Sequence, residues 1–141
     1  MSNLLFYNSS SGEGATAVLD SAGNYTFVSA IEGFSTDWSH IAGTFSGGVL
    51  FYNAASGEGA TAVLDSIGDY TFVGAIEGFS TDWTHIAPAG GGSSLLFYNA
   101  ASGEGATAVL DFIGTYTFVG AIEGFSKGWT HIVGAGGGVM A

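Results

Sequence analysis

One stretch of sequence occurs three times in this chain, and that repetition constrains the fold more than any other feature. Phe6 recurs as Phe51 and Phe97, a step of 45 residues and then of 46. A repeat of this length is a supersecondary unit whose hydrophobic core is completed by its neighbours. We therefore expect a single repeat domain, 1–141, made of three equivalent units at 4–48, 49–94 and 95–141.

Each unit contains four segments typical of short β-strands. In the first unit, residues 4–7 are continuously apolar, which is typical of a strand buried on both faces. Residues 15–20 alternate small alanines with larger side chains, and residues 25–30 alternate aromatic with β-branched or small ones. A shorter strand at 38–41 closes the unit. No helical periodicity persists, so the pattern predicts a four-stranded antiparallel meander in each repeat.

Glycine marks the predicted turns and bridges. Gly12 and Gly14 flank Glu13, and as glycines they allow positive φ on either side of it. Small alanines in the second strand predict close approach of a neighbouring sheet. The Gly-rich stretches 43–48, 87–94 and 134–138 are predicted to be flexible bridges between units.

Composition excludes several classes of protein. The formal net charge is −11, because twelve acidic residues face Lys127 alone. Nucleic acid is excluded as a partner, since phosphate binding needs Lys and Arg, and anionic membranes are disfavoured. With 47% hydrophobic and only 9% charged residues, the chain has enough apolar surface to fold.

Other features bear on compartment and covalent chemistry. The chain has no Cys, which excludes disulfides and thiolate metal sites. No signal peptide is visible at the N-terminus, and no apolar run approaches the ~20 residues of a membrane span. We expect a soluble protein, and the sequence does not indicate its compartment.

Three four-stranded units can be arranged in two ways. Radial packing gives an all-β propeller of four-stranded antiparallel blades, which normally needs four to eight blades. Three blades per chain cannot close a ring, so this fold requires homo-oligomerisation: a homodimer with six blades, or second a homotrimer with nine. The alternative is a β-trefoil, in which three four-stranded repeats complete one monomer.

The repeated motifs resemble those of known propellers. The order is Leu-Leu-Phe-Tyr-Asn, Gly-Glu, Asp-x-x-Gly, then Gly-Phe-Ser-Thr-Asp-Trp-Thr-His-Ile and a Gly-rich bridge. It resembles the tandem repeats of bacterial tachylectin-like and FG-GAP-like propellers across all three units. The chain departs from them in having Phe34, Phe79 and Phe125 in place of the first Trp of a closing pair. It also lacks the Asp-rich calcium loop of FG-GAP repeats, so calcium is not implied. The resemblance implies a propeller fold and, through the tachylectin-like members, sugar binding.

The first two repeats differ at only a few matched positions. Examples are Ser9 against Ala54, and Ser29 against Gly74. Such similarity indicates recent duplication or deliberate design from one blade. Near-identical units also make pairing between molecules easy.

Catalysis is not indicated by the residue pattern. Acid–base catalysis needs converging titratable groups with separated pKa values, and Asp37 and His40 are expected to point to opposite faces. The three matched histidines offer a symmetric metal site, but a structural hydrogen-bonding role beside each Trp is the preferred interpretation. We therefore predict no enzyme activity, no metal and no cofactor.

Carbohydrate binding is the predicted function. A sugar site needs an aromatic face and planar polar side chains, and each repeat supplies both. Repetition adds avidity. The candidate ligand-binding residues are Glu32, Asp37, Trp38, His40, Glu77, Asp82, Trp83, His85, Glu123, Trp129 and His131.

Two observations keep a second interpretation open. The third repeat has Lys127-Gly128 where the others have Thr-Asp, so a site that needs this Asp is broken there. Each Trp is also suited to a blade core. The alternative function is a symmetric, self-assembling scaffold, designed or recently duplicated, with no specific ligand.

Overall fold

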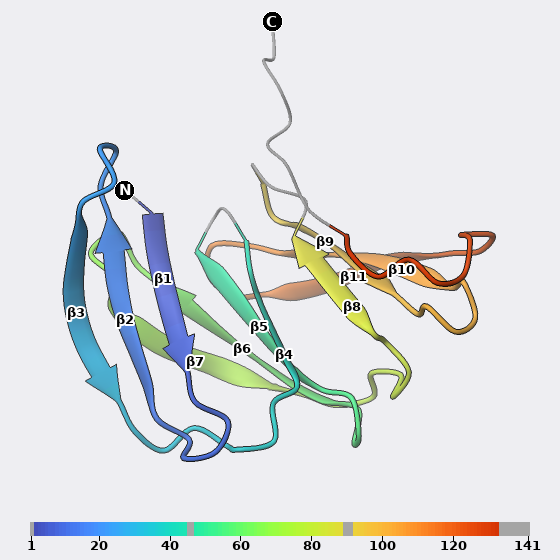
Figure 1. Ribbon diagram of the computed structural model, residues 1–141, viewed down its shortest axis with the longest axis horizontal. Coiled ribbons are helices and arrows are strands. Elements are labelled where there is room, and N and C mark those ends of the chain that lie inside the picture. Colours follow the sequence, from blue (N-terminus) through green and yellow to red (C-terminus); the bar gives the residue numbers. More distant parts are fainter. Residues whose placement is uncertain (1, 45–46, 89–91, 133–141) are drawn as a thin grey trace, which may run out of the picture.

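The computed structural model describes residues 2–44, 47–88 and 92–132, and all regular structure in these ranges is β-strand (Figure 1). None of the described residues belongs to a helix able to cross a membrane. The strands are β1 (Ser2–Tyr7), β2 (Gly14–Leu19), β3 (Tyr25–Ile31), β4 (His40–Gly43), β5 (Gly48–Asn53), β6 (Glu58–Leu64), β7 (Tyr70–Ile76), β8 (His85–Pro88), β9 (Ser94–Tyr98), β10 (Gly105–Leu110) and β11 (Tyr116–Ile122).

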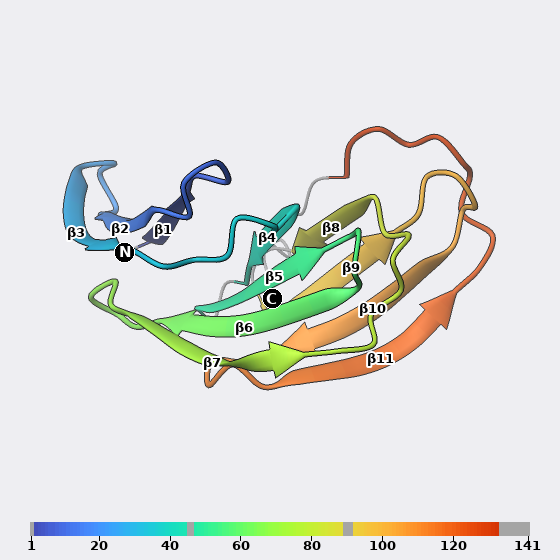
Figure 2. The ribbon, with the colours of Figure 1, turned by 90° about the horizontal axis from the view of Figure 1, so that it is seen from below.

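The strands form three antiparallel sheets. Their orders are β1-β2-β3, β4-β5-β6-β7 and β8-β9-β10-β11. Figure 2 shows the first sheet at one side of the molecule and the third at the other, with the second between them. The all-β prediction is confirmed. Within the described ranges the three sheets do not close into a ring.

The sheets are offset by one strand from the sequence repeats. The fourth segment of each repeat was expected to close its own meander, but β4 pairs with β5 of the next repeat, with His40 opposite Tyr52 and Ile41 opposite Phe51. β8 pairs with β9 in the same way. The loop before β4 carries the chain across to the next sheet, where Ile41 packs into the core beside Phe51. The first sheet consequently has three strands where the other two have four.

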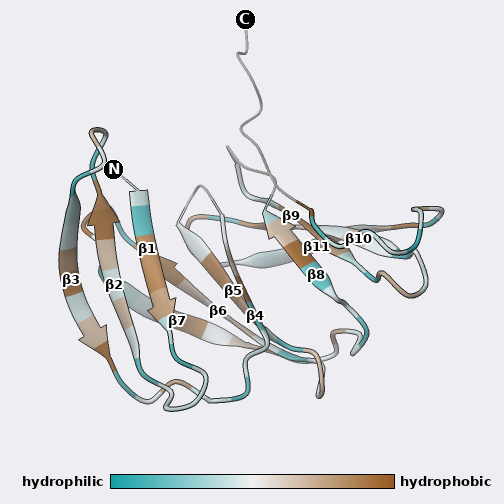
Figure 3. Ribbon diagram, viewed as in Figure 1, coloured by the Kyte–Doolittle hydropathy of each residue, from teal (hydrophilic) through white to brown (hydrophobic). Residues whose placement is uncertain are grey.

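Two hydrophobic clusters hold the sheets together. One lies between the first and second sheets and centres on Phe51, with Phe34 and Trp38 packed against it. The other lies between the second and third sheets and centres on Phe97, with Phe79 and Trp83 in the equivalent places. The hydrophobic residues coloured brown in Figure 3 run along the strands, β1 included.

Small residues permit this close approach, as the sequence predicts. Ala17, Ala62 and Ala108 are fully buried in the second strand of each repeat. The apolar first strand is also buried along its whole length in β5. β1, by contrast, has no fully buried residue, and Ser2 and Phe6 are exposed, so the expected two-sided burial does not hold for the first repeat.

The two glycines of each Ser-Gly-Glu-Gly motif have different roles. Gly12 has a φ of 77°, and its two counterparts share this left-handed conformation, which favours glycine. Gly59 lies inside β6 without positive φ, and a Cβ there would collide with the ring of Phe79. Both glycines of the motif allow positive φ, but only the first adopts it. The second glycine is required because the ring of the loop phenylalanine occupies the space of its side chain.

We expect Gly59→Ala to destabilise the fold by about 1–3 kcal/mol, because the added methyl group overlaps a half-buried aromatic ring. The free energy of unfolding in urea measures the change. Gly74→Ala is the matched control: no atom lies within 4 Å of a Cβ at that position, and the first repeat already has Ser29 there. Equal effects of the two substitutions would contradict the steric role of Gly59.

Candidate functional site: two equivalent pockets between sheets

Two pockets lie between neighbouring sheets at matching places. The pocket between the first and second sheets has a volume of about 280 Å³, and the pocket between the second and third about 370 Å³. All ten lining positions of one correspond to those of the other. They are Ile31, Glu32, Gly33, Phe34, Ser35, Trp38, Phe51, Ala60, Tyr70 and Phe72 in the first, and Ile76, Glu77, Gly78, Phe79, Ser80, Trp83, Phe97, Ala106, Tyr116 and Phe118 in the second.

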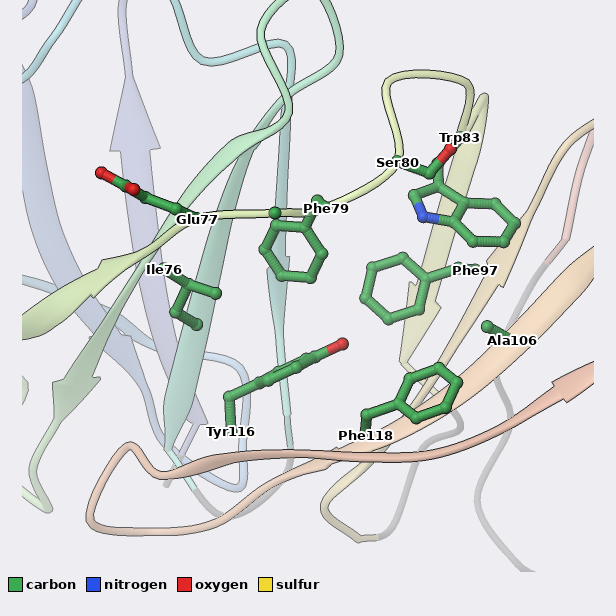
Figure 4. Close-up of a pocket in the computed structure, with 10 residues that line it drawn as sticks. Ile76, Glu77, Phe79, Ser80, Trp83, Phe97, Ala106, Tyr116 and Phe118 are labelled. Carbon is green, nitrogen blue, oxygen red and sulfur yellow. The ribbon is translucent and has the colours of Figure 1, made fainter.

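Aromatic rings from the loop between two sheets and from the second of those sheets form the walls of each pocket, and Figure 4 shows the larger pocket. In the larger pocket, the ring centroids of Phe79 and Tyr116 are 5.3 Å apart in an edge-to-face arrangement. The Trp83 and Phe97 centroids are 5.7 Å apart. Such pairs stabilise by about 0.5–1.5 kcal/mol beyond burial alone. Phe97 is buried, whereas Phe118 is 56% exposed, so the pocket has a fixed inner wall and an accessible outer ring.

The polar groups lie at the margin of the larger pocket. The Glu77 carboxylate points away from the rings in Figure 4, and the Tyr116 hydroxyl points in among them. Burial raises the pKa of Tyr116, and it raises the pKa of Tyr70 in the smaller pocket. These phenols stay protonated, so each can donate a hydrogen bond inside its pocket.

The structure brings together two of the predicted types of site residue. Glu32 and Trp38 line one pocket, and Glu77 and Trp83 line the other. Asp37 and Asp82 line neither. Both are exposed, Asp37 in the loop before β4 and Asp82 in the loop before β8. The backbone N–H of each donates to a serine hydroxyl two residues earlier.

The predicted histidines lie apart from both pockets. The His40 Nε2 is 3.0 Å from the Thr84 carbonyl oxygen, and the His85 Nε2 is 2.8 Å from the Thr130 carbonyl oxygen. Since a carbonyl only accepts, each Nε2 donates to the main chain of the following repeat. The Nδ1 atoms contact the adjacent Ser39 and Thr84 hydroxyls. His40 and His85 therefore connect successive repeats.

In the part of the third repeat that the structure describes, the candidate residues line separate cavities and not one matching pocket. Glu123 lines a separate cavity of about 240 Å³ that also contacts Trp83. Trp129 and His131 line another, of about 260 Å³, on the outer face of the third sheet. Trp129 is 55% exposed, whereas Trp38 and Trp83 are partly buried.

The structure adds pocket residues that the candidate set omits. Tyr70, Phe72, Tyr116 and Phe118 come from the outer strands of the sheet that follows each loop. Their sequence signal is the Tyr-Thr-Phe alternation, which places the two aromatic rings on one face of a strand. The pattern does not reveal that this face meets the Glu and Trp of the preceding repeat.

No three His, Cys, Asp or Glu residues gather as a possible metal site in the part of the chain that the structure describes. Comparison with protein-family models, with curated proteins and with solved structures found no match. The resemblance to tachylectin-like and FG-GAP-like repeats stays a prediction.

We expect Tyr70 and Tyr116 to ionise above the ordinary tyrosine pKa of about 10. Because their pKa is higher in the folded state than in the unfolded state, their contribution to stability is complete below pH ~10. That contribution is lost as the pH rises through the raised folded pKa. Tyrosinate absorbance during alkaline titration measures this, alongside the free energy of unfolding.

Tyr116→Phe serves as the control, since it removes one late-titrating phenol and keeps the ring. Loss of absorbance from the early part of the titration curve, and not from its late part, would contradict the raised pKa of Tyr116.

Proposed function

We propose that this protein binds carbohydrate, without catalysis, at repeated sites between its sheets. The observation that carries the proposal is the ten-for-ten match between the two pockets. Each pocket offers aromatic faces for the C–H groups of a sugar ring, together with a carboxylate and a phenol for its hydroxyls. Two or more such sites on one molecule give avidity from weak individual contacts.

The charge of the chain narrows the class of glycan. With a net charge of −11 and a Glu at each pocket, acidic sugars are repelled. Neutral glycans are the proposed ligands.

We further propose that the three sheets are blades of a β-propeller completed by homodimerisation to six blades, with a nine-bladed homotrimer as the second choice. Support comes from the repeated contact between separate sheets, each related to the next by the same aromatic packing. Separate sheets arranged side by side fit blades better than the shared barrel of a trefoil. A three-bladed chain reaches closure by adding copies of itself.

A symmetric scaffold, designed or recently duplicated and without a specific ligand, is the second candidate. The packing of Phe79 and Trp83 on Phe97 favours it, since these rings are also the core between two sheets. The direction of the Glu77 carboxylate, away from the rings, favours it as well.

Retention on an array of neutral and acidic glycans tests the first candidate. We expect binding to neutral glycans, and at least tenfold weaker binding by the double variant Phe72→Ala/Phe118→Ala, which removes the exposed ring from each pocket. Phe112→Ala is the matched control, because Phe112 is 71% exposed and lines neither pocket. No retention of the parent chain on any glycan would leave the scaffold as the better account.

Light scattering tests the oligomeric proposal. The chain has a mass of 14.2 kDa, and we expect the solution mass to be twice that value. A mass three times that of the chain would indicate nine blades. A monomer at all concentrations would contradict closure by homo-oligomerisation.

A further inference from the structure

The two ends of the chain carry the two halves of a third pocket. Six lining residues of each internal pocket come from the end of a repeat's third strand and the loop after it, and these have counterparts in the third repeat. The other four come from the next sheet, and these have counterparts in the first sheet. The third set is Ile122, Glu123, Gly124, Phe125, Ser126 and Trp129 with Phe6, Ala15, Tyr25 and Phe27. Within one chain these halves lie at opposite sides of the molecule (Figure 2).

Exposure distinguishes these residues from their counterparts. Phe6 is 47% exposed, whereas Phe51 and Phe97 are each 1% exposed in the same place of the following repeats. Tyr25 is 55% exposed, whereas its counterparts in the internal pockets are partly buried. Because residue type and strand position are the same, the difference lies in the neighbour. The first sheet lacks the loop that covers the second and third.

The strand pairing shows the same gap. β4 and β8 lie along the inner edges of the second and third sheets, and the described residues place no such strand beside β1. The sequence His-Ile that opens β4 and β8 recurs at His131 and Ile132, which belong to no strand. An unpaired edge with apolar side chains is a template for another strand.

We propose that a second copy of this chain supplies the missing half. Its His131 and Ile132 extend along β1, and the register of the internal sheets places Ile132 opposite Phe6. The partner's Phe125 then covers Phe6 as Phe34 covers Phe51 and as Phe79 covers Phe97. We call such a contact, between the loop of one repeat and the sheet of the next, a seam. Each copy supplies its loop to the other, so a dimer contains two seams between the chains and two additional pockets.

The partner on the first sheet is a second copy of the chain, because the contacts between sheets within one chain show which loop packs on such a sheet. Each internal seam joins the loop of one repeat to the sheet of the next, and the two ends of the chain repeat these same residue types. The proposed pairing also gives His131 a carbonyl acceptor for its hydrogen bond. The His40 and His85 Nε2 atoms each donate to a carbonyl of the next repeat, and the corresponding group for His131 is the partner's Ser39.

The binding of neutral glycans in this third pocket rests on the proposed carbohydrate-binding function. Its assembly rests only on the proposed homodimer, and the experiments below use no sugar. A blank glycan array with an intact seam would contradict the function alone.

A disulfide trap tests the register directly. The chain has no Cys, so the double variant Phe6→Cys/Ile132→Cys introduces the two thiols. Cross-strand neighbours lie at a separation that a disulfide can span. We expect oxidation to give a covalent dimer that reductant dissolves, and no dimer from the control Phe112→Cys/Ile132→Cys. A link within one chain, or no link, would overturn the proposed seam.

A substitution outside the core of the single chain provides the second test. Phe6→Lys places a charge on a side chain that is half-exposed before pairing, so the sheets of the single chain are retained. We expect a light-scattering mass near that of one chain, a fall of twofold from the parent dimer, with an unchanged far-ultraviolet circular dichroism spectrum. Phe112→Lys, the control, keeps the dimer. A dimeric Phe6→Lys variant would overturn the proposal.

Discussion

The structure depends on one phenylalanine ring in the loop after each third strand. Phe34 lies over Gly14 of its own sheet and contacts Phe51 of the next, so one side chain joins two sheets. Phe79 repeats the arrangement with Gly59 and Phe97. The absence of a Cβ on the glycine and the presence of a ring on the loop are thus one requirement. It explains why both residues recur in every repeat.

Local patterns in the sequence predict the strands, the buried alanines and the glycine of the first turn, because each depends on neighbours within a few residues. They do not predict which sheet the fourth segment joins. His40 and Ile41 pair with residues of the following repeat. The residues of a strand do not indicate which neighbouring strand it pairs with. The exposure of β1 escapes prediction for the same reason. Its sequence resembles that of β5, and only the neighbours differ.

Some residues of the candidate site could be predicted from the sequence and others could not, for the same reason. Glu77 and Trp83 are close in sequence and line one pocket, so their association is predictable. Tyr116 and Phe118 come from the next repeat, and their arrival depends on sheet packing that periodicity does not encode. The histidines were candidates because each is a planar polar side chain close in sequence to a Trp. Their hydrogen bonds to main-chain carbonyls depend on the spacing of repeats in three dimensions.

The offset between repeats and sheets also determines where the chain can be cut. Ending a piece at a repeat boundary separates β4 from β5, or β8 from β9, and leaves one sheet without its inner strand. A circular permutation that opens the chain in the loop before β4 would keep every strand with its partners. Two segmentations of this sequence are therefore possible, one following the sequence repeat and the other following the hydrogen-bonded sheet. They differ by a single short strand.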